Sequence, residues 1–294
     1  MSSASRGVTV PDEDIERETQ GVGTYADVNG IKLYYEVHGT GHPLILLHGG
    51  LGATSMFGPN LPALAKGRQV IAVDLQGHGR TADIDRPISA ELMAGDIAAL
   101  IKHLGLDRPD VMGYSLGGGV AFFTAVRYPE LVGKLVIVST NIKRSAIYPE
   151  MLVQQAQVGP EAAEAMKQTP MYQLYASIAP RPEDWGRLLG KIGEAMKGDF
   201  DYSNEVPKIK ATTMVVAGDA DIFPPSHAVE FFGLLGGGKR DGGWDGSGAA
   251  ERTARDPAWR DPLHDGHRPG ARPDGNRVPR RAGSEGSVSQ PARS

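Results

Sequence analysis

The chain of 294 residues contains no cysteine. Disulfide bonds, thiolate nucleophiles and cysteine-ligated metals are therefore excluded, and stability has to come from burial of apolar side chains. The absence of cysteine fits a reducing compartment. We expect a cytoplasmic location because the sequence shows neither a signal-peptide pattern nor a membrane span.

The chain also lacks an excess of positive charge and a long apolar run. Its 31 Lys and Arg residues stand against 35 Asp and Glu residues, so no net positive charge is available to meet a nucleic-acid backbone. No run approaches the roughly 18 apolar residues of a membrane span, and residues 1–20 are polar and acidic, unlike a signal peptide. We therefore expect neither a nucleic-acid nor a membrane partner. The oligomeric state is not indicated.

Short apolar runs alternate with helical patterns along most of the chain. Three continuous apolar runs, typical of parallel strands buried on both faces, lie at residues 44–47, 70–73 and 135–138. Residues 89–104 have apolar side chains at helical spacing behind Ser89, which can cap the helix. A second helix is expected after Ser115, and a further strand at residues 214–217. This alternation predicts an α/β fold with a mostly parallel central sheet and helices on both faces.

Changes in composition predict the domain organisation. The predicted parts are an N-terminal extension (1–24), a core in two segments (25–140 and 208–235), a small helical cap between them (141–207), a Gly-rich loop (236–248) and a tail (249–294). In the tail all nine basic residues are Arg, with six Pro, five Gly and hardly any aliphatic side chain. Such a segment cannot build a core, so we predict a disordered tail.

The sequence G-Y-S-L-G at residues 113–117 follows an apolar segment and precedes a predicted helix. Glycines at both ends permit a tight strand-to-helix turn, because no Cβ atoms clash there. The Ser115 hydroxyl then projects above the sheet as a nucleophile, and the amide of Leu116 faces a developing oxyanion. Because the chain has 39 glycines, the alternative is a chance match to G-x-S-x-G.

Two further loops follow predicted strands. In L-L-H-G-G at residues 46–50, the amide of Gly50 is the candidate for a second oxyanion donor. The sequence D-L-Q-G-H-G-R at residues 74–80 is typical of a rigid loop at the same sheet edge. We predict structural roles for His48 and His78, because a histidine between a buried strand and a glycine turn more often satisfies backbone groups than performs catalysis.

Two acids, Asp219 and Asp221, follow the strand predicted at residues 214–217. A carboxylate fixed at this edge can hold a catalytic histidine in one tautomer, and the chain order Ser, acid, His is that of nucleophile-elbow enzymes. We choose Asp221 because it lies deeper in the turn, four residues before Pro225. The alternative is that both aspartates cap the following helix.

Along the chain, the loop at residues 46–50 comes first, then the loop at 74–80, the G-x-S-x-G turn and the two acids. Together these four motifs resemble the α/β-hydrolase superfamily of the small-esterase, lactonase and cofactor-free haloperoxidase type, over about residues 25–248. The resemblance implies a nucleophile at Ser115, an acid at Asp221, and an oxyanion hole from Gly50 and Leu116. It implies a serine hydrolase acting on an ester, lactone or related acyl bond of a small molecule, with no cofactor and no metal. Dehalogenases and epoxide hydrolases of this superfamily place aspartate at the position of Ser115, which argues against those activities.

Cap residues that can line an acyl pocket are the Met and aromatic side chains Met151, Met166, Met171, Tyr172, Tyr175 and Trp185. Core packing is the alternative, since a stripe of such residues at helical spacing is often buried between helices.

The family's catalytic histidine, expected after a last apolar strand, has no counterpart after residue 248. His264 and His267 lie in a stretch rich in Arg, Asp and Pro. A serine hydroxyl without a base is a weak nucleophile. His264 is the candidate substitute base, provided that the tail docks over Ser115.

The codons implied by the tail offer an explanation. Read one base further along, residues 254–263 can encode Leu-Ala-Ile-Leu-Pro-Gly-Val-Thr-His-Tyr, which is the missing strand and histidine loop. The codon beginning inside Trp259 is fixed as Gly, and those inside Asp256 and Asp261 give only Ile or Thr. Our hypothesis is a single-base frameshift near residue 248 or 249. Two alternatives remain: a non-catalytic protein that binds a small ligand in the cap pocket, and a frameshifted product without function.

The frameshift hypothesis predicts that the coding DNA, read one base on after residue 249, gives an open frame with the strand and histidine above. Sequencing of the gene checks this. Stop codons or polar residues in the shifted frame would refute the hypothesis.

Overall fold

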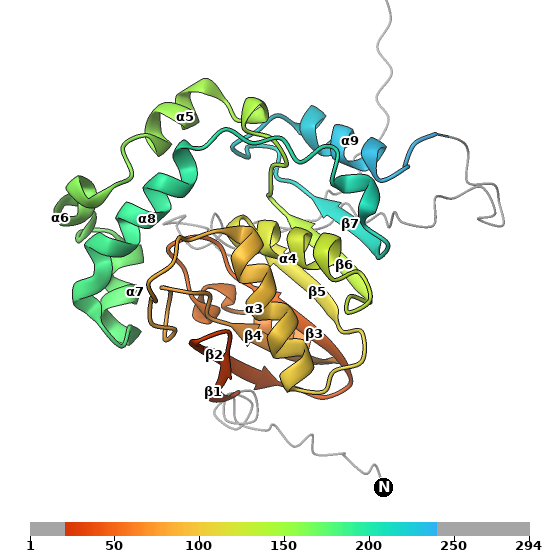
Figure 1. Ribbon diagram of the computed structural model, residues 1–294, viewed down its shortest axis with the longest axis horizontal. Coiled ribbons are helices and arrows are strands. Elements are labelled where there is room, and N and C mark those ends of the chain that lie inside the picture. The colour runs from red at the N-terminus through yellow and green to blue at the C-terminus, as the bar shows by residue number, and fades with distance from the viewer. Residues whose placement is uncertain (1–20, 240–294) are drawn as a thin grey trace, which may run out of the picture.

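The computed structural model describes residues 21–239 (Figure 1). The predicted tail with His264, most of the Gly-rich loop, and the N-terminal extension up to residue 20 lie outside the described residues.

A seven-stranded sheet with strand order β1-β2-β4-β3-β5-β6-β7 forms the centre of the fold. Its strands are β1 (Val22–Val28), β2 (Ile31–His38), β3 (His42–Leu47), β4 (Arg68–Val73), β5 (Asp110–Tyr114), β6 (Lys134–Val138) and β7 (Thr212–Val216). β2 pairs antiparallel with both β1 and β4, and all other pairings are parallel. The mostly parallel α/β sheet predicted from the sequence is confirmed.

Strand β1 was not predicted, and it begins at Val22, before the expected start of the core at residue 25. It forms a hairpin with β2 in which Val28 lies opposite Ile31. The two turn residues, Asn29 and Gly30, both have positive φ values, of 48° and 77°. Asn-Gly is the preferred pair for such a two-residue hairpin, so the sequence did carry a signal for this strand.

Apolar side chains on both faces of the sheet explain the continuous apolar runs. Ile45 and Leu47 of β3 pack into one buried cluster, whereas Leu44 and Leu46 pack into the other. Successive side chains of a strand point to opposite faces, so a strand covered on both sides has to be apolar throughout.

Helices cover both faces of the sheet, as expected. α3 (Ala90–His103) and α4 (Leu116–Arg127) pack on the face of Ile45, and α2 (Asn60–Ala65) packs on the face of Leu44. α3 begins after Ser89, whose side chain accepts a hydrogen bond from the Leu92 amide at 3.4 Å, which is the predicted cap. α9 (Pro225–Leu234) follows β7.

Four helices lie between β6 and β7, and Figure 1 shows them as an arc outside the layers of the sheet. They are α5 (Pro149–Gln155), α6 (Ala163–Met166), α7 (Pro170–Ile178) and α8 (Trp185–Lys197). Two ion pairs hold α8 against the loop after β4. In that loop the buried carboxylate of Asp83 accepts a hydrogen bond from Lys191 Nζ at 2.6 Å and pairs with Arg187 Nε at 2.9 Å. Within residues 21–239, no helix has both the length and the apolarity to cross a bilayer.

The first turn of α4 approaches the end of β3 too closely for any residue with a Cβ atom. A Cβ on Gly117 would lie 2.4 Å from the Leu47 carbonyl oxygen and 2.5 Å from that of His48. A Cβ on Gly113 would lie 2.1 Å from the carbonyl oxygen of Gly117. These are backbone atoms that cannot rotate away, so both glycines of the G-x-S-x-G sequence are needed for packing.

We predict that Gly117→Ala lowers the free energy of unfolding by about 1–3 kcal/mol or more, because overpacking forces α4 away from β3. Gly233→Ala is the matched control: its Cβ meets nothing within 4 Å, and it lies inside α9. There, alanine should be neutral or stabilising by up to about 1 kcal/mol. Chemical denaturation of both variants checks this, and equal stabilities would contradict it.

Candidate active site

Ser115 lies in the turn that joins β5 to α4. Its φ is 51° and its ψ is −116°, a backbone conformation that residues with side chains rarely adopt. Its amide donates to the Val138 carbonyl oxygen at 2.9 Å, which fixes the turn against β6. Strain of this kind persists where the surrounding structure imposes it, and it is frequent at functional sites.

The loop after β3 lies beside this turn because the strands are parallel and in register. Leu47, the last residue of β3, lies opposite Gly113. A Cβ on Gly49 would lie 3.4 Å from the Ser115 Cβ, and one on Gly50 would lie 3.8 Å from a Leu116 methyl carbon. The structure thus brings together Gly50, Ser115 and Leu116. Leu116 is the first residue of α4, where an amide has no intrahelical acceptor.

A cavity of about 460 Å³ opens at this point, a volume typical of small-molecule sites. Gly50, Ser115 and Leu116 lie in its wall together with mainly apolar side chains, among them Phe122, Phe123, Ile142, Ile192, Met196, Phe200 and Tyr202. Arg144 is the one charged side chain of the wall as far as the described residues define it.

The structure distinguishes the two roles considered for the Met and aromatic side chains of the cap. None of the six Met and aromatic residues named above is part of the cavity wall. Tyr175 and Trp185 are buried in the core cluster, and Met166 and Tyr172 pack against it. The part of the wall that lies between β6 and β7 comes instead mainly from the end of α8, from Phe200 and Tyr202, and from six residues after β6: Ser139, Thr140, Asn141, Ile142, Arg144 and Ile147. Core packing, the alternative, therefore describes four of the six.

Asp221 is half-buried in the loop after β7 and is held by backbone amides. Its Oδ1 accepts from the Ile222 amide at 2.8 Å, and its Oδ2 accepts from the Gly218 amide at 3.4 Å. Its neighbour Ile222 lies in the cavity wall. Asp219 is exposed. Helix capping, the alternative role, is excluded for both acids because Pro224 is the N-cap residue of α9 and no side chain caps that helix.

No histidine lies in the wall of the cavity as formed by residues 21–239. His227, which no sequence motif indicated, is buried in α9, and burial lowers its pKa. Its Nε2 accepts from the Ile142 amide at 3.0 Å, and its Nδ1 lies 3.3 Å from Glu230 Oε2. Both ring nitrogens are engaged, so His227 ties α9 to the segment after β6 and is not free to act as a base.

His48 joins the loop after β3 to the loop after β4. Its Nε2 accepts from the Leu75 amide at 3.0 Å, which leaves Nδ1 to donate to the Gly49 carbonyl oxygen at 2.7 Å. Burial lowers its pKa to about 4. His78 is equally buried, with Nδ1 2.8 Å from the Gln76 carbonyl oxygen and with a pKa lowered to about 3, mainly by burial. These contacts fit the structural roles expected for both histidines.

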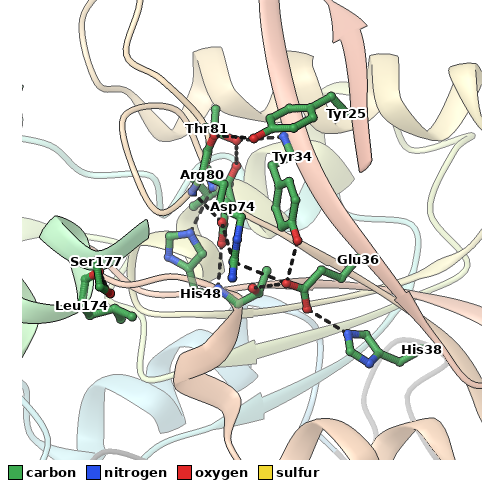
Figure 2. A network of polar contacts seen from close by, with 12 residues as sticks. Tyr25, Tyr34, Glu36, His38, His48, Asp74, Arg80, Thr81, Leu174 and Ser177 are labelled. Atoms are coloured by element: carbon green, nitrogen blue, oxygen red, sulfur yellow. Dashed lines mark hydrogen bonds and ion pairs between the residues drawn. The ribbon is translucent and has the colours of Figure 1, made fainter. Parts of the chain in front are cut away.

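A buried network around Asp74 holds the loop at residues 74–81 rigid, and Figure 2 shows Tyr34, Glu36 and Arg80 gathered beside it. Asp74 accepts from the Thr54 amide at 2.7 Å and from the Arg80 amide at 2.8 Å. The Arg80 guanidinium lies over the Tyr34 ring, 4.9 Å from its centroid, and pairs with Glu36 at 3.4 Å. Asp74 is therefore a structural group, consistent with the rigid loop predicted there.

No group of three or more potential metal-ligating side chains occurs among the described residues.

Because His48 is buried in its neutral form, we predict that the free energy of unfolding depends on pH. Its pKa is about 4 in the folded protein and about 6.5 in the unfolded chain, so between these values the unfolded chain binds more protons. The free energy of unfolding should therefore fall as pH is lowered from 6.5 to 4, by up to about 1.4 kcal/mol per pH unit.

Other buried groups also change the pH dependence of the free energy of unfolding. His78 adds a slope of the same sign as His48. Asp74, whose pKa is raised by burial, adds a slope of opposite sign. The measurement is therefore a comparison of the wild type with His48→Gln by denaturation at several pH values. The exposed His103 supplies the control, His103→Gln. A slope that is unchanged in His48→Gln and reduced in His103→Gln would contradict the assignment.

Comparisons with known proteins agree with this architecture. Residues 42–174 match the family model for the alpha/beta hydrolase fold. The chain is 39% identical over 115 residues to a soluble epoxide hydrolase of Corynebacterium sp. (strain C12), covering 38% of this chain and 39% of that protein. It is 28% identical over 214 residues to the serine hydrolase BPHL of Mus musculus, covering 69% and 72%.

Among solved structures, an esterase of Thermogutta terrifontis superposes with a TM-score of 0.57 at 26% identity, over 74% of this chain and 86% of that one. The chain spans only about two fifths of the epoxide hydrolase. The family-model match at residues 42–174 contains the strands and turns that surround Ser115. The sheet order, the strand-to-helix turn and these matches lead to one conclusion: the chain has the α/β-hydrolase fold.

Proposed function

We propose that this protein is a serine hydrolase that cleaves an ester, lactone or related acyl bond of a small molecule. The observation that carries the proposal is the placement of Ser115: it occupies a strained strand-to-helix turn at the wall of a 460 Å³ cavity, beside Gly50 and Leu116. A hydroxyl presented in this way, next to backbone amides that can bind an oxyanion, is suited to acyl transfer.

In the proposed reaction the Ser115 oxygen attacks the substrate carbonyl carbon, and the amides of Gly50 and Leu116 stabilise the negative charge on the carbonyl oxygen. The alcohol leaves with a proton, and water then cleaves the acyl-serine ester. Asp221 orients the histidine that takes the serine proton and returns it to the leaving group. We assign that histidine to the native carboxyl terminus that the shifted reading frame encodes, with His264 as the candidate substitute in the chain as written.

The relatives support hydrolase activity and help to distinguish cleavage of an acyl bond from cleavage of an epoxide. The mouse relative is a serine hydrolase by name, and the structural neighbour is an esterase. The Corynebacterium relative is an epoxide hydrolase, but enzymes of that activity in this superfamily carry aspartate where this chain has Ser115. Serine favours acyl bonds, because its ester intermediate is released by water attacking the acyl carbon.

The proposal predicts that a version carrying the shifted-frame tail hydrolyses p-nitrophenyl acetate, and that Ser115→Ala lowers kcat/KM by about 10³-fold or more. Asp221→Asn should lower it by about 10²-fold to 10⁴-fold, whereas Asp219→Asn, at an exposed acid in the same loop, should change it less than about threefold. Ser139→Ala is the control for the nucleophile, since Ser139 lies in the same cavity wall.

The chain as written, assayed alongside, separates the alternatives. Activity only with the shifted-frame tail supports the frameshift hypothesis. Activity of the chain as written that depends on both Ser115 and His264 identifies His264 as the base. A folded protein that hydrolyses nothing and binds ligands in the cavity is the non-catalytic alternative, and insoluble protein points to a product without function. Hydrolysis of styrene oxide but not of p-nitrophenyl acetate would overturn the proposal.

A further inference from the structure

Arg144 is the one charged side chain that the described residues place in the cavity wall, and no Asp or Glu lies there. We propose that Arg144 makes the cavity specific for acyl compounds that carry a second, free carboxylate away from the bond to be cleaved. The identity of that bond rests on the proposed function, whereas the carboxylate site rests on the contacts and charge of Arg144.

Backbone pairing directs Arg144 into the cavity. The Arg144 amide donates to the Phe200 carbonyl oxygen at 2.9 Å, and the Tyr202 amide donates to that of Ile142 at 2.8 Å. Alternate residues of such an antiparallel pair share a face. Ile142, Arg144, Phe200 and Tyr202 all line the cavity, whereas the intervening Lys143 does not. The direction of the arginine is therefore set by the backbone.

Arg144 has no carboxylate partner among residues 21–239. Its Nη1 donates to the carbonyl oxygen of Met196, in the last turn of α8. A guanidinium has five N–H donors, so this carbonyl leaves most of them unused.

The neighbouring charged side chains of this pair of segments have contacts of their own outside the cavity. Lys143 pairs with Glu230 at 2.5 Å, and Asp201 accepts from the Ser203 amide at 2.8 Å. Neither Glu230 nor Asp201 lies in the cavity wall. The positive charge of Arg144 is thus left for whatever occupies the cavity.

The chemistry of the wall defines the ligand class. A guanidinium and a carboxylate pair through two parallel hydrogen bonds, and such a pair is stronger where apolar surroundings exclude water. Phe122, Phe123 and Ile192 supply those surroundings and suit the hydrocarbon part of a ligand. A neutral ester of the same shape would fill the cavity but leave the guanidinium desolvated and unpaired, which disfavours binding.

The test compares matched pairs of ligands that resist hydrolysis: succinamic, glutaramic and adipamic acids against their diamides. Each pair has one length and shape and differs in charge. By titration calorimetry with the full chain at pH 7, at least one acid should bind tenfold or more tightly than its diamide. Acids that bind no better than the diamides, or no binding by either, would overturn the proposal.

Variants then assign the preference to one side chain. Arg144→Gln should lower the affinity for the acid by tenfold or more and leave that for the diamide unchanged, and Arg144→Lys should retain part of the preference. Lys143→Gln, the same loss of charge one residue away and outside the cavity wall, should keep it. If a folded Arg144→Gln variant still binds the acid more tightly than the diamide, Arg144 has only a structural role through its contact with α8, and the proposal is wrong.

Ser115→Ala separates this inference from the proposed function. The preference for acids should persist in that variant, because binding needs no nucleophile. A preference for acids without any hydrolysis would refute only the proposed function, and hydrolysis without the preference would refute only the role of Arg144.

Discussion

The approach of α4 to the end of β3 is the contact on which the candidate site depends. The carbonyl oxygens of Leu47 and His48 occupy the space where a Cβ of residue 117 would be, so only glycine allows the helix to begin there. Because α4 begins so close to the sheet, the chain has to reverse direction at Ser115, and this residue takes up a positive φ. The same approach brings the loop after β3 beside the turn. One steric constraint thus places the hydroxyl, the two candidate amides and the mouth of the cavity together.

Most polar side chains near this edge of the sheet are committed to holding the loops. His48 links the loops after β3 and β4 through backbone groups, Asp74 holds the loop after β4, and His227 joins α9 to the segment after β6. Burial favours the neutral form of each of these groups: it lowers the pKa of His48 and of His227 and raises that of Asp74. Ser115 and Arg144 differ from them because their side chains lie in the cavity wall. This contrast, more than the number of polar residues, makes the cavity the candidate ligand site.

The sequence predicted the parts of this arrangement that depend on local patterns. Continuous apolar runs located the parallel strands because burial on both faces requires them, and the glycines around Ser115 predicted the tight turn. The cavity wall was not predictable in this way. It comes from segments far apart in the chain, among them the stretch from Ser139 to Ile142, the end of α8 and Phe200 with Tyr202, and only their tertiary packing brings them together. Met and aromatic residues in the cap indicated apolar burial correctly but could not distinguish core from cavity.

The central claim is that Ser115, Gly50 and Leu116 form an acyl-transfer site. A crystal structure of the protein with the shifted-frame tail, after reaction with a p-nitrophenyl phosphonate ester, tests it most directly, because the adduct mimics the tetrahedral intermediate. Phosphorus should be bonded to the Ser115 oxygen, with one phosphonyl oxygen about 3 Å from both amide nitrogens. An adduct on another residue, or a phosphonyl oxygen pointing away from these amides, would contradict it.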